Sequence, residues 1–219
     1  MTAKKATRGA HRMTESSPPA VCRESRQPGC ARPRQAAPGA IILTDLHGPI
    51  GGTLVRLTVD AENTATGRFL PYWAGFMNMR HTIEPQDAHN TWYVDDPVTS
   101  STDVDPMIMQ YERTFTFAAQ WQLPDVQWGL ATLTEGEWRT VRLSAADGSW
   151  AEVDIEPMHG AHRVRQDGPR RLWDTIEAVH QFWHDNGKPG YDRYGLTATP
   201  TRQHVWLDEP DSPHRWTLS

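Results

Sequence analysis

Apolar and polar residues alternate with a period of two in several short segments of the chain. Residues 53–60 read TLVRLTVD, and similar patterns occupy residues 126–133, 137–144 and 150–155. Such segments are typical of half-buried strands, and a short turn or an Asp-Gly pair between two of them favours a hairpin. The pattern predicts a domain dominated by an antiparallel β meander.

Residues 113–123, RTFTFAAQWQL, carry the clearest alternation in the chain. The large or apolar residues at every second position are Phe115, Phe117, Ala119, Trp121 and Leu123. We therefore predict a strand there. Residues 82–107 are rich in Pro, Asp, Ser and Thr and predict a long loop, which in a domain is often a lid or a binding loop.

A helical period occurs near the C-terminal end. The apolar residues spaced at i, i+4, i+7 and i+11 are Leu172, Ile176, Val179 and Trp183. This stripe predicts one amphipathic helix, with Gly168 as N-cap, Pro169 in the first turn and Asn186-Gly187 at its end. Residues 194–199 and 203–208 predict a β-hairpin after it, and the remaining tail is expected to be irregular. The expected fold class is α+β.

The first 40 residues differ from the rest of the chain. They hold eight basic and two acidic residues, whereas the whole chain of 219 residues has a formal net charge of −5. They are poor in large apolar residues and predict a disordered basic leader, residues 1–40, before a single domain over residues 41–219. The acidic remainder argues against a nucleic-acid partner, whose site would be basic.

Composition also bears on the cellular compartment. Both cysteines, Cys22 and Cys30, lie in the leader, which fits a reducing compartment, and their spacing is not that of a zinc ribbon. The sequence has no run of about eighteen apolar residues and no apolar signal segment. We expect a cytoplasmic protein that does not span a membrane.

Four histidines are the candidate metal ligands. His180 and His184 stand four apart on the predicted helix, and His159 and His162 could join them. That spacing suits a metal, but Gln181 stands where a metalloprotease motif has its general base. Exposed histidines beside a buried stripe are the simpler interpretation. No glycine-rich nucleotide loop, nucleophile elbow or cysteine nucleophile is found in residues 41–219.

A short segment with apolar side chains has two interpretations. Trp73, Met77, Met79 and Arg80 could line a peptide-binding groove, because methionine adapts to varied ligands. Apolar residues at such spacing more often belong to a core.

The same segment, GFMNMR at residues 75–80, resembles a segment that follows the catalytic domain in bacterial protein-L-isoaspartate O-methyltransferase-like enzymes. Residues 163–210 are closely similar to the C-terminal extension of the actinobacterial members that tailor lanthipeptides and graspetides. The resemblance covers residues 41–210. It implies an enzyme that uses S-adenosylmethionine to methylate an aspartate of a ribosomal peptide.

The resemblance assigns no catalytic or cofactor-binding residue to this sequence. In the family those residues lie in an N-terminal Rossmann-like domain, and residues 1–40 do not match it. The sequence thus predicts an accessory, substrate-recognition domain whose partner is a ribosomal precursor peptide or a separate methyltransferase subunit. Two alternatives stay open: a metal-dependent enzyme that uses the four histidines, and a non-functional fragment of the methyltransferase.

Overall fold

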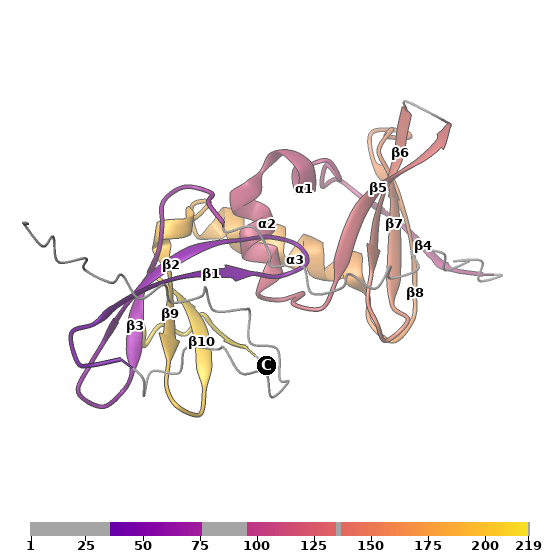
Figure 1. Cartoon of the computed structure of the whole chain (residues 1–219). Helices are drawn as coiled ribbons and strands as arrows, with labels where there is room; N and C mark the ends of the chain where they lie inside the picture. The colour runs from indigo at the N-terminus through magenta and orange to yellow at the C-terminus, as the bar shows by residue number, and fades with distance from the viewer. Residues whose placement is uncertain (1–35, 76–95, 135–136, 219) are drawn as a thin grey trace, which may run out of the picture.

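Two antiparallel sheets stand at opposite ends of the protein, and helices lie between them (Figure 1). The computed structural model describes residues 36–75, 96–134 and 137–218. The predicted leader, residues 1–40, therefore lies almost entirely outside the described residues. The fold is mostly antiparallel β structure with a few helices, which agrees with the expected α+β class.

The first three and the last three strands of the described chain form the larger sheet. The strands are β1 (Ile41–His47), β2 (Gly52–Val59), β3 (Ala65–Phe69), β4 (Val98–Thr102), β5 (Gln127–Thr134), β6 (Glu137–Ser144), β7 (Trp150–Asp154), β8 (His162–Asp167), β9 (Tyr194–Ala198), β10 (Gln203–Leu207) and β11 (Arg215–Leu218). The helices are α1 (Ile108–Tyr111), α2 (Arg113–Gln120), α3 (Leu172–Asp185) and the short 3₁₀ helix η2 (Tyr191–Arg193).

The six-stranded sheet has the order β1-β2-β3-β9-β10-β11. Its early and late strands meet where β3 pairs with β9, for example at Thr66 opposite Thr197. One face of this sheet carries the buried residues Val55, Leu57, Phe69 and Leu196 and packs toward α2. The other face, which we call the outer face, points away from that core.

The five-stranded sheet has the order β4-β8-β7-β6-β5. Strands β5 to β8 form consecutive antiparallel pairs, so the predicted meander over residues 126–155 is confirmed. Gly148 in the turn between β6 and β7 has a φ of 87°, the left-handed conformation that glycine adopts without a steric penalty. The strand predicted over residues 53–60 is confirmed as β2.

The predicted strand over residues 113–123 is wrong, because residues 113–120 form helix α2. Every residue from Phe115 to Gln120 is buried, so burial there does not follow a period of two. The ring of Phe117 contacts those of Phe69, Trp121 and Tyr191 at centroid distances of 4.9 Å each. A helix that is enclosed on all sides can carry apolar residues at both odd and even positions. The apparent alternation therefore does not reflect one buried and one exposed face.

Three other expectations need correction. The predicted loop over residues 82–107 contains β4, and the tail after residue 208 contains β11. The helix begins at Leu172 rather than near Gly168. The backbone N–H of Trp173 donates to the side-chain oxygen of Gln166 at 3.1 Å, so β8 supplies the cap that the local sequence was expected to supply.

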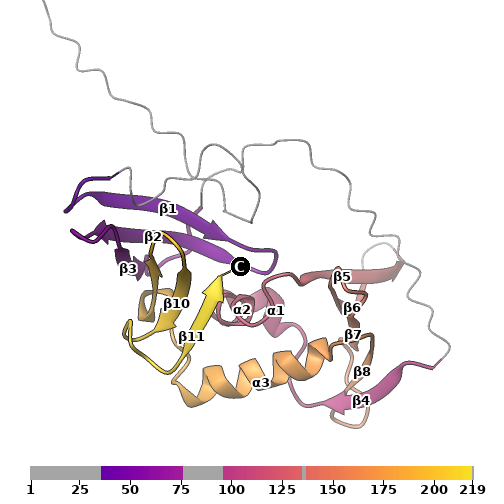
Figure 2. The same cartoon turned by 90° about the horizontal axis from the view of Figure 1, so that it is seen from below.

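Helix α3 runs from the five-stranded sheet toward the six-stranded one (Figure 2). Leu172, Ile176 and Val179 are each 0 % exposed, and Trp183 is 3 % exposed. This is the predicted apolar stripe, and it faces the core that both sheets share. Among the described residues, no helix is long and apolar enough to cross a membrane.

Candidate functional site

The four candidate histidines are not assembled into one cluster. His180 is half-buried on α3, with its ring centroid 5.9 Å from that of Phe115, whereas His184 is exposed on the same helix. The Nδ1 atom of His162 lies 3.0 Å from the carbonyl oxygen of Asp154, and His159 lies in an exposed turn. Within residues 36–75, 96–134 and 137–218, no group of three or more His, Cys, Asp or Glu side chains is placed to hold a metal ion.

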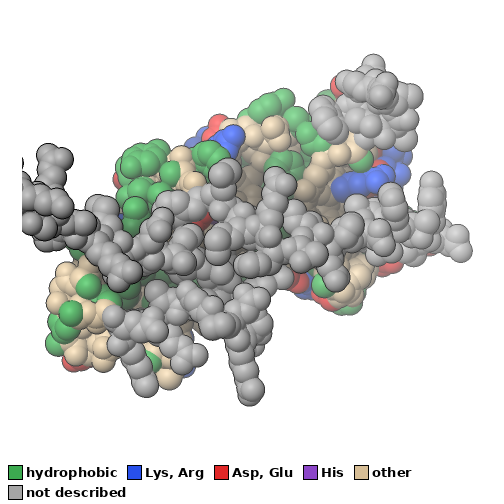
Figure 3. Space-filling view, in the orientation of Figure 1, with side chains coloured by type: hydrophobic (Ala, Val, Ile, Leu, Met, Phe, Trp, Pro, Cys, Tyr) green, Lys and Arg blue, Asp and Glu red, His purple; other side chains and the backbone are tan. Residues whose placement is uncertain are grey.

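Trp73 is the one member of the predicted peptide-contact set that the structure describes; Met77, Met79 and Arg80 lie outside the described residues. Trp73 is 56 % exposed, and the guanidinium of Arg113 lies 4.9 Å from its ring centroid. The interpretation that this tryptophan belongs to a core is therefore wrong. Hydrophobic side chains also gather in several patches on the face of the molecule that Figure 3 shows.

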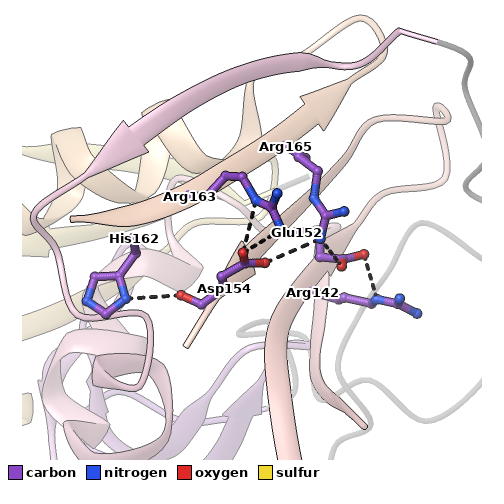
Figure 4. A network of polar contacts seen from close by, with 6 residues as sticks. All are labelled: Arg142, Glu152, Asp154, His162, Arg163 and Arg165. Atoms are coloured by element: carbon purple, nitrogen blue, oxygen red, sulfur yellow. Dashed lines mark hydrogen bonds and ion pairs between the residues drawn. The ribbon is translucent and has the colours of Figure 1, made fainter. Parts of the chain in front are cut away.

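Charged side chains form a ladder on the exposed face of the five-stranded sheet (Figure 4). Glu152 accepts hydrogen bonds from Arg142 at 3.0 Å and from Arg165 at 2.6 Å. Asp154 pairs with Arg165 at 3.3 Å and with Arg163 at 2.8 Å. Because each arginine is paired with a carboxylate, this ladder keeps only a small net positive charge and few free donors for a ligand. Exposed pairs of this kind contribute at most about 1 kcal/mol each to stability.

The outer face of the six-stranded sheet has a different character. The cross-strand register places two neighbouring rows of side chains on it. The first row is Ile41, Thr58, Thr66, Thr197, His204 and Thr217, and the second is Leu43, Arg56, Arg68, Gly195, Trp206 and Arg215. Threonines and basic residues therefore share one open face with two apolar side chains at its β1 edge.

One arginine of this face is fixed in place by backbone carbonyls. Arg68 donates to the carbonyl oxygens of Asp192 at 3.2 Å and Arg193 at 3.3 Å, and also to that of Asp208. Its guanidinium lies 5.0 Å from the ring centroid of Trp206, a cation–π contact.

The neighbouring arginine is held much less. Arg56 is exposed, and its side chain has no hydrogen bond or ion pair with any residue that the structure describes. Arg68, by contrast, also lies 3.5 Å from a carboxylate oxygen of Glu209. These two arginines lie opposite each other in the sheet. The guanidinium of Arg68 is already engaged in hydrogen bonds and an ion pair, whereas that of Arg56 is available for a ligand.

Strand β1 forms an edge of the six-stranded sheet, since among the described residues it pairs with β2 alone. On its outer face Ile41 is 59 % and Leu43 is 46 % exposed. Its opposite side is anchored, because Ile42 and Leu46 pack against the core. The strand is thus held firmly on one side and presents apolar side chains on the other.

Two polar side chains that contact each other lie on the outer face at the end of β1. The Nδ1 atom of His47 contacts Oδ1 of Asp45, the carboxylate two residues earlier. Glycines make room for the imidazole: a Cβ atom would lie 2.5 Å from its Cγ at Gly52 and 2.8 Å from its Cε1 at Gly75. Segment 72–75 therefore lies against this end of β1, and the hydroxyl of Thr53 also holds that segment through the carbonyl of Tyr72 at 2.9 Å.

Two partly buried histidines are expected to make the stability of the domain depend on pH. Burial lowers the pKa of His180, with smaller effects from His184 and Lys188, and burial followed by Arg215 and Arg202 lowers the pKa of His204. The unfolded chain, with a histidine pKa near 6.5, therefore binds these protons before the folded chain does. The free energy of unfolding is expected to fall as pH decreases from about 7.5 to about 5.5.

Urea denaturation of the wild type and of a His180→Gln, His204→Gln double variant measures this dependence. The double variant should show a flatter profile over the same pH range, because it lacks both titrating groups. A single Ala178→Gln variant, changed at an exposed position of α3 and removing no titrating group, serves as control and should keep the wild-type slope. Identical slopes in all three proteins would refute the assignment.

Sequence reasoning missed most of the outer face. The alternation of residues 53–60 does place Arg56 and Thr58 on one side of a strand, and that signal was available. Arg215 and Thr217 belong to a strand that was not predicted, and only the pairing register brings them onto the same face.

Comparison with known proteins adds no relative: no family model, curated protein or solved structure matches this chain. The resemblance to peptide aspartate methyltransferases therefore stays a prediction. Among the described surfaces, the β1 edge joins exposed apolar side chains to the unpaired guanidinium of Arg56 on one open face.

Proposed function

We propose that this chain is a substrate-recognition domain that binds an extended peptide along β1. It would serve a protein-L-isoaspartate O-methyltransferase-like enzyme that methylates aspartate in a ribosomal peptide. The observation that carries the proposal is the β1 edge, where Ile41 and Leu43 are 59 % and 46 % exposed.

An edge strand offers a row of backbone N–H and C=O groups to another chain. Peptide-binding domains use this property, with main-chain hydrogen bonds for affinity and alternate side chains for specificity. On β1 the alternate side chains that a bound peptide would meet are Ile41 and Leu43. Because Ile42 and Leu46 anchor the strand to the core, little conformational entropy would be lost from the protein on binding.

Aromatic residues extend this surface beyond the end of β1. Gly75 lies against His47, and Tyr72 is bonded to Thr53, which is opposite Leu46 in the register. A peptide that continues past His47 would therefore meet Gly75 first. It would reach Tyr72 and Trp73 where it turns toward the α2 side of the sheet, on which Trp73 lies against Arg113. Tyr72 and Trp73 are 59 % and 56 % exposed there and offer large apolar contacts at a low entropic cost.

The finer features of the proposal rest on the resemblance. Helix α3 and the hairpin of β9 and β10 correspond to the block of residues 163–210 that carries it. In this proposal the S-adenosylmethionine site belongs to a separate catalytic domain or subunit, and this chain supplies the peptide. Isothermal titration of the chain with S-adenosylmethionine should give no binding heat, whereas micromolar binding would contradict this division of labour.

A phage-displayed library of random dodecapeptides with a central aspartate tests peptide binding directly. The wild type should enrich peptides with an apolar residue two positions from the central aspartate, because alternate side chains of an added strand lie on the same face and one of them would contact Ile41. The affinity of a selected synthetic peptide, measured by fluorescence anisotropy, should fall at least about tenfold in an Ile41→Gln variant, a loss of roughly 1.4 kcal/mol.

The other sheet provides a matched control. Val98 on β4 is 45 % exposed and, like Ile41, lies on a strand at the edge of its sheet among the described residues. A Val98→Gln variant should keep the wild-type affinity. The proposal fails if no peptide is enriched over a scrambled sequence, or if the two glutamine variants weaken binding equally.

A further inference from the structure

The outer face of the six-stranded sheet carries more basic charge than the described residues neutralise. Its strands contribute Arg56, Arg68 and Arg215 but a single acidic side chain, Asp45, which already contacts His47. Glu209, beyond the end of β10, lies 3.5 Å from Arg68.

The five-stranded sheet shows the contrast. There Glu152 and Asp154 pair with the three arginines beside them. On the outer face Arg56 and Arg215 keep no such partner among the described residues. An open basic face on a chain with a net charge of −5 favours an anionic partner.

We infer that Arg56 binds a carboxylate of the peptide that lies along β1, so that the recognised peptides are acidic at one fixed position. This inference rests on the proposed function, and it adds the chemical class of the ligand and the residue that selects it. The occupant of the face is an Asp or Glu side chain of the added strand.

The register fixes which peptide residue would reach Arg56. Leu43 lies opposite Arg56, so the peptide residue opposite Leu43 belongs to the same row of the outer face. Its Cα would lie two strand spacings, roughly 10 Å, from that of Arg56. An arginine and a carboxylate side chain reaching toward each other across Leu43 can span this distance. The flanking residues of the peptide on that face would lie beside Ile41 and Asp45.

The neighbouring arginine strengthens the argument. Arg56 lies directly opposite Arg68 in the pairing of β2 and β3, and like charges in that position repel. Arg68 cannot turn away, because three backbone carbonyls and the ring of Trp206 hold it. Arg56 keeps its guanidinium donors available, and a carboxylate would form charge-assisted hydrogen bonds with them while reducing the repulsion.

A double-mutant cycle between protein and peptide tests the contact. The probe is a synthetic peptide selected by the wild type, together with its copy in which the central aspartate is replaced by Asn. The wild type should prefer the acidic peptide by about tenfold, and an Arg56→Gln variant should lose that preference while still binding the amide copy as the wild type does. Added NaCl should weaken only the acidic pair.

Arg215→Gln is the matched control, because Arg215 is exposed on the same face but lies on the opposite edge strand. Its preference for the acidic peptide should equal that of the wild type. An equal loss of acid preference in Arg215→Gln and Arg56→Gln would overturn the assignment. The preference would then come from the summed positive charge of the face and not from a contact with Arg56. Undiminished acid preference in Arg56→Gln would overturn it as well.

Two further outcomes separate this inference from the proposed function. If Ile41→Gln weakens binding but the acidic and amide peptides bind the wild type equally, the carboxylate contact is refuted and peptide recognition by β1 stands. If a fluorescent single-stranded oligonucleotide binds the wild type more tightly than the acidic peptide and loses affinity in Arg56→Gln, the face binds phosphate, and both proposals fall.

Discussion

Replacing Ile176 by aspartate is expected to abolish the cooperative unfolding of this domain. Ile176 is 0 % exposed in the middle of α3, the helix between the two sheets. The change removes about 1.5–3 kcal/mol of apolar burial and places a carboxylate where it has no partner, which costs several kcal/mol more. A domain with a net stability of roughly 5–15 kcal/mol does not tolerate such a loss.

Urea denaturation followed by circular dichroism measures this effect. The control is Ala178→Asp, which places the same side chain on the exposed side of the same helix and should lower the free energy of unfolding by only about 1 kcal/mol, the cost of helix propensity and of the nearby Asp174. An Ile176→Asp protein with a wild-type transition would show that this side of α3 is not buried in the core.

A single methyl group at Gly195 is expected to destabilise the domain by about 1–3 kcal/mol or more. A Cβ atom there would lie 2.1 Å from the ring of Trp206 and 2.6 Å from the carbonyl oxygen of Gly67. The ring cannot yield freely, because its Nε1 donates to Thr197 at 3.0 Å and Arg68 lies over it. Gly195→Ala therefore forces apart strands at the centre of the six-stranded sheet.

Thermal and urea unfolding of Gly195→Ala should be compared with those of Gly129→Ala. Gly129 also lies in a strand, β5, but a Cβ atom there would meet nothing within 4 Å. Alanine loses less conformational entropy than glycine on folding, so Gly129→Ala should be neutral or slightly stabilising. Equal stability of the two variants would contradict the close packing of Trp206 on Gly195.

The elements that sequence patterns found are those with one buried and one open side. Strand β2 alternates cleanly over its second half, and α3 buries a single stripe, so their periods of 2 and 3.6 were visible. Helix α2 has no such contrast, because all of its residues from Phe115 onward are buried. Its apolar and small residues satisfied a strand pattern equally well, and only the tertiary packing decides between the two.

Two of the strands that were missed, β8 and β11, lack a clear alternation of apolar and polar residues. The strand β8 reads HRVRQD and buries Val164 together with the polar Gln166, which is paired with α3. The strand β11 lies at an edge and has four residues. Neither offers enough apolar alternation to be recognised, because their positions depend on partners elsewhere in the chain.

The candidate site was less predictable than the fold. Trp73 was identified from sequence as a possible peptide contact, and its exposure is consistent with that interpretation. The outer face combines residues from β1 to β11, and no local pattern brings Arg56 and Arg68 together. The full pairing of charges on the five-stranded sheet and the incomplete pairing on the outer face both depend on strand register, which the sequence alone does not specify.

The pairing of β3 with β9 has a consequence for how the protein is made. Thr66 and Thr197 meet across this pair although 131 positions separate them, and the whole five-stranded sheet lies between them in sequence. During synthesis, β1 to β3 leave the ribosome long before their partner, while β5 to β8 can pair as they emerge. The smaller sheet and α3 would form first, and the larger sheet that supports the β1 edge would be completed only when the last strands arrive.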